Sequence, residues 1–223
     1  MEIKDLLKKD LMIMDLKAST KMEAIDEMVA KLKEKNIISD EVVFKDLILK
    51  REERSSTGLG EGIAMPHAKT SVVNTPSVLF ARSNKGIDYD ALDDEPVYIF
   101  FMIAASEGAH DLHIETLAKL SKMLLNDDFT QGLKTCGSPD EVYALVDKYS
   151  EKPEETVKEE VKEVQNTNKK RILAVTACPT GIAHTYMAEA ALKEAGEKLG
   201  VDVKVETNGA DVIKNNLTSN DIN

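Results

Sequence analysis

Two segments of the chain carry residues whose types and spacing suit phosphate chemistry. The first is STGLGEGIAMPH, which ends at His67 and has a glycine at every second position from 58 to 62. Glycines let the backbone turn tightly and approach an anion closely, and Pro66 fixes the chain beside the histidine. A neutral imidazole at such a rigid edge can attack a phosphoryl group through one ring nitrogen while a hydrogen bond holds the other. The alternative interpretation is a histidine that caps a turn.

The second segment is CPTGIAHT, which begins at Cys178 directly after the apolar run ILAVTA. The N–H groups of such a loop, together with the start of the helix expected near residue 183, form a cradle for an anion. That positive end also lowers the pKa of the thiol and favours the thiolate. A cysteine phosphatase would need an arginine six residues after the cysteine, and here that residue is His184. The segment therefore favours holding and passing on a phosphoryl group over hydrolysing it.

The other reactive side chains give weaker signals. His110 and His113 are three residues apart and could form half of a metal site, but no third ligand stands at a recognisable spacing, so we expect neither a metal nor a cofactor. Arg51 lies in the charged run KREERSS, which is typical of a solvated face. Cys136 follows no apolar strand and is interpreted as structural. Redox chemistry is not expected, because the chain has no C-x-x-C motif.

The elements around His67 predict an α/β fold of the α+β kind, or a sandwich with a mixed sheet, because strands and helices do not alternate regularly. Apolar runs at 78–82 and 97–105 predict strands, and a helix is expected from about 110 to 125. Residues 138–149 predict a helix that begins at a serine cap followed by proline.

Two further helices are expected before His67, each with one apolar face. For residues 20–35, behind a cap at Ser19 or Thr20, this face comprises Ala24, Ile25, Met28, Val29 and Leu32. For residues 40–53 the predicted face comprises Val42, Val43, Leu47 and Leu49.

The chain divides at a charged segment. Residues 151–163 contain six Glu and three Lys, with valine as the apolar residue type, so they cannot bury enough surface to offset the entropy of ordering. We interpret 151–169 as a linker between a domain at 1–150 and a second module at 170–223. A solvated charged helix is the alternative, since Val157, Val161 and Val164 recur at helical spacing.

The second module predicts a βαβ unit with a right-handed crossover. Its second strand is expected at 201–206, after a long helix that ends at Gly200. A parallel pair of strands has both edges open and is not expected to be stable alone. We therefore expect this module to be incomplete.

Composition excludes several classes of function. The chain has 223 residues, a formal net charge of −11, 4% aromatic residues and no Trp. Such a surface would repel a nucleic-acid backbone. No stretch approaches the roughly 20 apolar residues that cross a bilayer, and the N-terminus lacks a signal-peptide core. Two cysteines do not suggest a disulfide framework. These features predict a cytoplasmic protein that does not insert directly into a membrane.

Taken together, these motifs resemble enzyme II of the bacterial sugar phosphotransferase system (PTS), fructose–mannitol type. The segment GEGIAMPHA resembles the phosphorylation-site signature of its IIA domain. The family has an arginine 16 residues before the active histidine and a second histidine 46 residues after it, and these positions hold Arg51 and His113. Residues 170–223 resemble the start of a fructose-type IIB domain, with ACPTGIAHTYMAEAAL as its active-site segment. The segment is shorter than a IIB domain of the family, and NGADVIKNNL departs from the family's glycine-rich run.

The resemblance implies a phosphotransferase that works as a relay. A phosphohistidine carrier protein (HPr-like) donates to His67, which passes the group to a IIB cysteine, Cys178 or that of a separate IIB, for uptake of a sugar through a membrane IIC component. Fructose is the expected sugar, and the protein would associate with the membrane through the permease complex. Arg51 would clamp the phosphoryl oxygens and His113 would lie beside the acceptor ring. The implied phosphate-binding residues are Ser56, Thr57, Thr180, Gly181, His184 and Thr185.

Two alternatives remain open. Relatives of the IIA domain act in nitrogen control, so histidine phosphorylation could serve as a signal instead of a transport intermediate. The second alternative is a cysteine phosphatase centred on Cys178, although the arginine found in the phosphate loop of such enzymes is missing here. The IIB-like segment favours sugar transport.

Overall fold

The computed structural model describes residues 3–108, 116, 119–150, 171–177, 183–208, 213–215, 217–218 and 221, and only the backbone at 183, 184, 186, 187, 213 and 214. The chain divides into two compact units. The first comprises Met1–Thr116 and Asn126–Glu151, and the second comprises Leu117–Leu125 and Lys152–Asn223.

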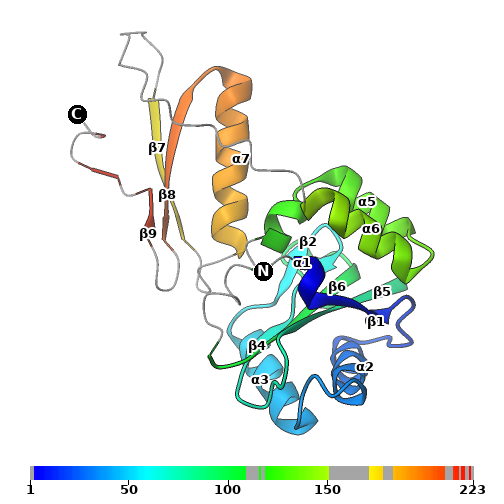
Figure 1. Ribbon diagram of the computed structural model, residues 1–223. Helices are drawn as coiled ribbons and strands as arrows, with labels where there is room; N and C mark the ends of the chain where they lie inside the picture. Colours follow the sequence, from blue (N-terminus) through cyan, green and yellow to red (C-terminus); the bar gives the residue numbers. More distant parts are fainter. Residues whose placement is uncertain are drawn as a thin grey trace. The chain divides into compact units, whose positions relative to one another are not determined.

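The first unit is built on a mixed six-stranded sheet (Figure 1). The strand order is β1-β5-β6-β3-β2, with β4 also paired to β6. Strands β5 and β6 are antiparallel, whereas β1 is parallel to β5, and β3 and β4 are parallel to β6. The strands are β1 (Leu7–Ile13), β2 (Gly58–Gly60), β3 (Ile63–Ala64), β4 (His67–Lys69), β5 (Ser77–Ile87) and β6 (Val97–Ala105).

The two central strands confirm the sequence prediction. The expected strand at 78–82 lies within β5, and the expected strand at 97–105 has the bounds of β6. Every residue of β6 except Tyr98 is buried, as expected for a strand covered on both faces. Figure 1 shows how this is achieved: α2 (Lys21–Glu34) and α3 (Glu41–Arg54) lie on one side of the sheet, and α5 (Asp127–Thr135) and α6 (Pro139–Ser150) on the other.

Helix α2 has the predicted apolar face. Its N-cap is Thr20, whose hydroxyl accepts a hydrogen bond from the Glu23 N–H, the usual way to satisfy a helix start. The five residues predicted to face the core are all buried: Ala24, Ile25, Met28, Val29 and Leu32.

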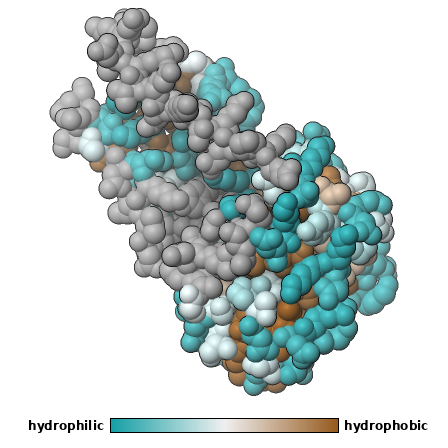
Figure 2. Space-filling model, viewed as in Figure 1, coloured by the Kyte–Doolittle hydropathy of each residue, from teal (hydrophilic) through white to brown (hydrophobic). Residues whose placement is uncertain are grey.

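The predicted face of α3 is wrong in part, because Leu47 and Leu49 pack against the core but the two valines do not. Val42 is 72% exposed and Val43 is 40% exposed, whereas Phe44, Ile48 and Glu52 are the buried residues of this helix. The buried residues of α3 are spaced four apart. The third of them, Glu52, is charged, so a prediction made from apolar residues alone could not include it. Figure 2 shows that hydrophobic surface, in brown, appears among the hydrophilic side chains of the first unit.

Some of the remaining elements were predicted from the sequence and others were not. Helix α6 confirms the helix expected at 138–149, with Val142 and Val146 buried. Strand β1, helix α5 and the short helix α1 (Ile3–Leu6) were not predicted. Three consecutive exposed residues inside β1 obscure its alternation. Of the helix expected over 110–125, residues 116 and 119–124 are helical, while most of the earlier residues and the segment 151–169, predicted to be a linker, lie outside the described residues.

The second unit contains the predicted βαβ arrangement. Strand β7 (Arg171–Ala177) is parallel to β8 (Asp202–Asn208), and α7 (Ala183–Leu199) connects them in sequence. Gly200 follows the helix with φ +64°, the left-handed conformation common at helix ends. A third strand, β9 (Ile213–Lys214), pairs antiparallel with β8. No pattern predicted β9, because two residues are too few to form one.

Candidate functional site

The backbone places His67 at the edge of the first unit's sheet. Strands β3 and β4 run in succession along β6, with His67 in register with Ile103. Pro66 lies between these two strands, and its carbonyl accepts a hydrogen bond from the Ile103 N–H at 2.9 Å. Proline has no N–H to donate and is tolerated at such an edge. His67 is therefore the first residue of a short edge strand, and it is half-buried.

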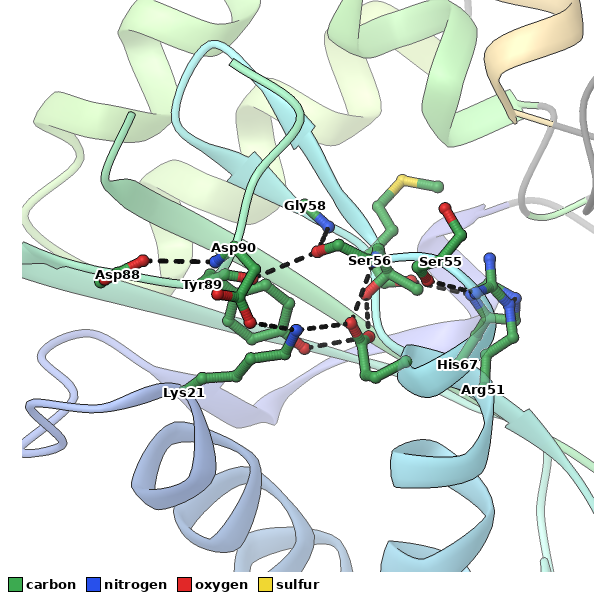
Figure 3. A network of polar contacts seen from close by, with 12 residues as sticks. Lys21, Arg51, Ser55, Ser56, Gly58, His67, Asp88, Tyr89 and Asp90 are labelled. Carbon is green, nitrogen blue, oxygen red and sulfur yellow. Dashed lines mark hydrogen bonds and ion pairs between the residues drawn. The ribbon is translucent and has the colours of Figure 1, made fainter. Parts of the chain in front are cut away.

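Arg51 reaches this histidine from the last turn of α3. Its Nε donates a hydrogen bond to His67 Nε2 at 3.1 Å, and its Nη1 donates to the Ser55 carbonyl at 2.8 Å. Figure 3 shows the two side chains meeting. The second bond keeps the guanidinium directed toward the imidazole, because it ties Arg51 to the chain segment that follows its own helix.

These contacts define which ring nitrogen of His67 carries the proton. His67 Nδ1 lies 2.8 Å from the Met65 carbonyl oxygen, which can only accept a hydrogen bond. The guanidinium of Arg51 can only donate, so Nε2 must be the acceptor. The ring is thus the neutral tautomer with a proton on Nδ1 and a lone pair on Nε2.

Electrostatics support the same protonation state. The pKa of His67 is lowered to about 4, mainly by burial and also by the positive charge of Arg51, while the hydrogen bond to Met65 acts in the opposite direction. The imidazole is consequently neutral at physiological pH. A neutral ring with a directed lone pair can act as a nucleophile without first losing a proton.

The two hydroxyl residues predicted beside the site have other partners. Ser56 Oγ donates to the Tyr89 carbonyl at 3.2 Å and accepts from the Gly58 N–H at 3.1 Å. Thr57 is 2% exposed and its hydroxyl donates to the Glu52 carboxylate. Arg51 and His67 are therefore brought together, whereas the hydroxyls of Ser56 and Thr57 would have to give up these bonds to reach a phosphate.

The glycines before His67 are explained by local geometry. A Cβ atom at Gly58 would lie 2.8 Å from the Ala91 Cα. Gly60 and Gly62 have φ values of +97° and +80°, which side-chain-bearing residues adopt only with strain. These glycines allow the β2–β3 hairpin to turn and pack, and this hairpin leads the chain to His67.

The remaining predicted site residues are described in part. Cys178, His113, Thr180 and Gly181 lie outside the described residues, and for His184 only the backbone, in α7, is described. Thr185 is 2% exposed; its carbonyl accepts from Thr176 Oγ1 at 3.2 Å, and its own hydroxyl has no hydrogen-bond partner within the described segments.

Glu52 is a residue of this neighbourhood that the sequence analysis missed. It is 9% exposed and contacts Thr57, Tyr89 and Lys21. Glu52 lies four residues after Ile48 and eight after Phe44, and this spacing was the sequence signal that could have predicted its burial. In the part of the chain that the structure describes, no three His, Cys, Asp or Glu side chains are placed to hold a metal ion.

Comparison with known families identifies the chain. A family model described as "Phosphoenolpyruvate-dependent sugar phosphotransferase system, EIIA 2" matches residues 5–149. A second model, described as "PTS system, Lactose/Cellobiose specific IIB subunit", matches residues 173–223. The chain belongs to the EIIA 2 family of the PTS, followed by a IIB-type segment, and is thus a phosphotransferase component. The resemblance stated from the sequence is confirmed.

Individual proteins agree with this assignment. The fructose-specific EIIABC component of Bacillus subtilis is 44% identical over 222 residues, covering 100% of this chain and 35% of the relative. The crystal structure of the nitrogen regulatory protein IIA-Ntr from Neisseria meningitidis matches 65% of this chain and 98% of that chain, with a TM-score of 0.61 and 28% identity. The Escherichia coli complex of enzyme IIA and phosphorylated enzyme IIB for mannitol matches 64% of this chain and 99% of that chain, with a TM-score of 0.56 and 26% identity. The chain spans about one third of the length of the multi-component curated relatives that it matches.

Proposed function

We propose that His67 is the phosphoryl acceptor of this chain and that Nε2 is the nucleophilic atom. The observation that carries the proposal is the pair of hydrogen bonds at the ring, from Nδ1 to the Met65 carbonyl and from Arg51 Nε to Nε2. The first holds the proton on Nδ1, and the second places a permanent positive charge where phosphoryl oxygens would arrive.

The proposed step moves a phosphoryl group between two imidazoles. A phosphohistidine carrier protein docks with its phosphorus in line with Nε2, the new N–P bond forms, and the N–P bond of the donor breaks. The electron pair of the broken bond stays on the donor ring. Positive charge that develops on the ring of His67 is stabilised through Nδ1–H by the Met65 carbonyl, and Arg51 turns from Nε2 to the oxygens of the phosphoryl group. Catalysis is mostly positioning and electrostatics.

The wider pathway follows from the family. We infer a IIA domain at 1–150, a linker at 151–169 and the N-terminal part of a IIB domain at 170–223. His113 would lie beside His67 in the IIA domain. Cys178 would accept the phosphoryl group next, or a cysteine on a separate IIB would, before transfer to a sugar bound by a membrane IIC component. The sugar we infer is fructose, on the strength of the name of the Bacillus subtilis relative.

We infer that the chain acts at a membrane permease. Among the described residues, no helix is both long enough and apolar enough for a membrane span. We infer from the family resemblance that the chain works together with a membrane IIC component.

The test is phosphorylation with phosphoenolpyruvate, enzyme I and the carrier protein. We expect an acid-labile, base-stable phosphate on His67 that is lost in His67→Ala and kept in the matched control His110→Ala. Equal labelling of His67→Ala would refute the assignment. Mass spectrometry of a peptide spanning 171–187 tests the next step: phosphocysteine at Cys178 would support transfer within this chain, and its absence would favour a cysteine on a separate IIB.

A regulatory function is the second candidate. The observation that favours it is the match to the nitrogen regulatory protein from Neisseria meningitidis. The two functions differ in the fate of the phosphoryl group: a transport component passes it through a IIB cysteine to a sugar, whereas a regulator retains it as a signal. Chase of labelled protein with a IIB and IIC membrane fraction and sugar distinguishes them. A phosphatase centred on Cys178 would be recognised by hydrolysis of an aryl phosphate.

A further inference from the structure

Glu52 is a buried carboxylate that the phosphoryl-transfer step does not use. It follows Arg51 directly in α3 and is 9% exposed. An ionised carboxylate in such a place requires donors to replace water. The groups that donate hydrogen bonds to Glu52 show which chain segments it holds in place.

The Glu52 carboxylate accepts hydrogen bonds from three chain segments. Oε2 accepts from the Thr57 N–H at 3.0 Å and pairs with Lys21 Nζ at 3.1 Å. Oε1 accepts from the Thr57 hydroxyl and from the Tyr89 hydroxyl at 3.2 Å. Lys21 is the first residue of α2, Thr57 directly precedes β2, and Tyr89 follows β5. Figure 3 shows this network beside the Arg51–His67 pair.

Thr57 links this network to the catalytic ring. Its carbonyl accepts a hydrogen bond from the Met65 N–H at 2.9 Å, and the Met65 carbonyl in turn binds His67 Nδ1 at 2.8 Å. A continuous series of contacts therefore runs from Glu52 through Thr57 and Met65 to His67. The position of the Met65 carbonyl decides whether Nδ1 keeps the ring proton.

The same carboxylate also affects the other side of the ring. Thr57 lies two residues after Ser55, whose carbonyl accepts from Arg51 Nη1 at 2.8 Å. By fixing Thr57, Glu52 restrains the segment that directs the guanidinium toward Nε2. Both hydrogen bonds that define the state of His67 thus depend on the placement of residues 55–57.

We propose that Glu52 is a positioning residue for phosphoryl transfer, which acts through Thr57 and Met65 to hold His67 in its Nδ1–H tautomer with Nε2 facing Arg51. The inference rests on the proposed role of His67. The tautomer of the His67 ring can be measured without any phosphoryl donor.

The principal experiment compares the wild-type chain with Glu52→Gln. Glutamine keeps the volume but presents an NH2 group to donors that need an acceptor, so Thr57 should lose a partner. We expect the ¹⁵N shifts of the His67 ring to report a mixture of tautomers instead of one. The rate of phosphoryl acceptance from the carrier protein should fall about 10- to 100-fold, the range expected from small misplacements.

A matched control separates positioning from general stability. Ile48→Val removes one methylene from the same buried row of α3 without touching the network. It should lower the unfolding temperature while leaving the His67 tautomer and the transfer rate at wild-type values. If Glu52→Gln lowers the unfolding temperature in the same way but keeps the wild-type tautomer and rate, Glu52 only stabilises the fold and the proposal is overturned.

A second pair of variants covers the case in which Glu52→Gln does not fold. Thr57→Val removes the hydroxyl bond to Glu52 and should shift the tautomer in the same direction, whereas Thr57→Ser retains the hydroxyl and should restore the wild-type ring state. Identical ring spectra for the two variants would contradict the proposal. If the wild-type chain is not phosphorylated at His67, the proposed function fails, yet the tautomer measurement still decides the role of Glu52.

Discussion

Arg51 Nε lies 3.1 Å from His67 Nε2, so a helix end and an edge strand separated by 16 positions share one hydrogen bond. The contact exists because α3 packs with Phe44, Ile48 and Glu52 inward, which turns the neighbouring Arg51 toward the sheet edge. It combines a permanent cation and a neutral imidazole in one place.

Removing the guanidinium should affect both rate and protonation. In Arg51→Ala, the loss of one preorganised donor should slow phosphorylation of His67 by about 10²- to 10³-fold without abolishing it. Loss of the adjacent positive charge should raise the pKa of His67 from about 4 toward its ordinary value. Quenched-flow labelling and an NMR titration measure the two effects. The control is Arg54→Ala, an exposed arginine of the same helix turn, and an equal loss of rate in both variants would argue against a specific role for Arg51.

The low pKa of His67 predicts how stability depends on pH. Between about 6.5 and about 4 the unfolded chain binds a proton at this residue that the folded chain does not. The free energy of unfolding should therefore decrease as pH falls through this window, with no further loss from this group below it. The contribution is about 1–3 kcal/mol.

Denaturant unfolding of wild-type protein and His67→Gln from pH 4 to pH 8 measures this contribution as the difference between the two curves. Parallel curves would show that His67 titrates alike in the folded and unfolded states. Between pH 6 and pH 8 the ring should remain neutral, so its protonation should impose no pH dependence on phosphoryl acceptance.

The corrected face of α3 gives a stability prediction. Phe44→Ala should lower the free energy of unfolding by about 3–5 kcal/mol, because the ring is fully buried. Val42→Ala should change it by less than about 0.5 kcal/mol, because Val42 is 72% exposed. Urea denaturation of both variants is the measurement. Comparable losses of the free energy of unfolding in the two variants would instead support the inner face predicted from the sequence.

The second unit can be tested at a glycine in α7. A Cβ atom at Gly196 would lie 2.2 Å from Val203 Cγ2 and 3.1 Å from the Val201 carbonyl. Gly196→Ala should therefore displace α7 from β8 at a cost of about 1–3 kcal/mol. Amide hydrogen exchange should show faster exchange in β7 and β8, while α2 and β6 of the first unit keep wild-type protection. Unchanged exchange in β8 would mean that the helix accommodates the methyl group.

Local patterns in the sequence were sufficient for several elements. The buried face of α2 could be read from the periodicity of apolar residues, and the bounds of β6 from a continuous apolar run. One buried helix face leaves a repeating signal, whereas a strand covered on both faces leaves an unbroken one. The motif around His67 and the resemblance it carries likewise identified the family. These features depend on neighbours in sequence.

Other features were decided only by the tertiary structure. The inner face of α3 contains Glu52, whose burial is possible only because Lys21, Thr57 and Tyr89 arrive from distant segments to satisfy it. The tautomer of His67 likewise depends on the Met65 carbonyl and on Arg51. Sequence periodicity records which residues avoid water, but a buried charge and the proton of an imidazole are set by partners that only folding brings within hydrogen-bond distance.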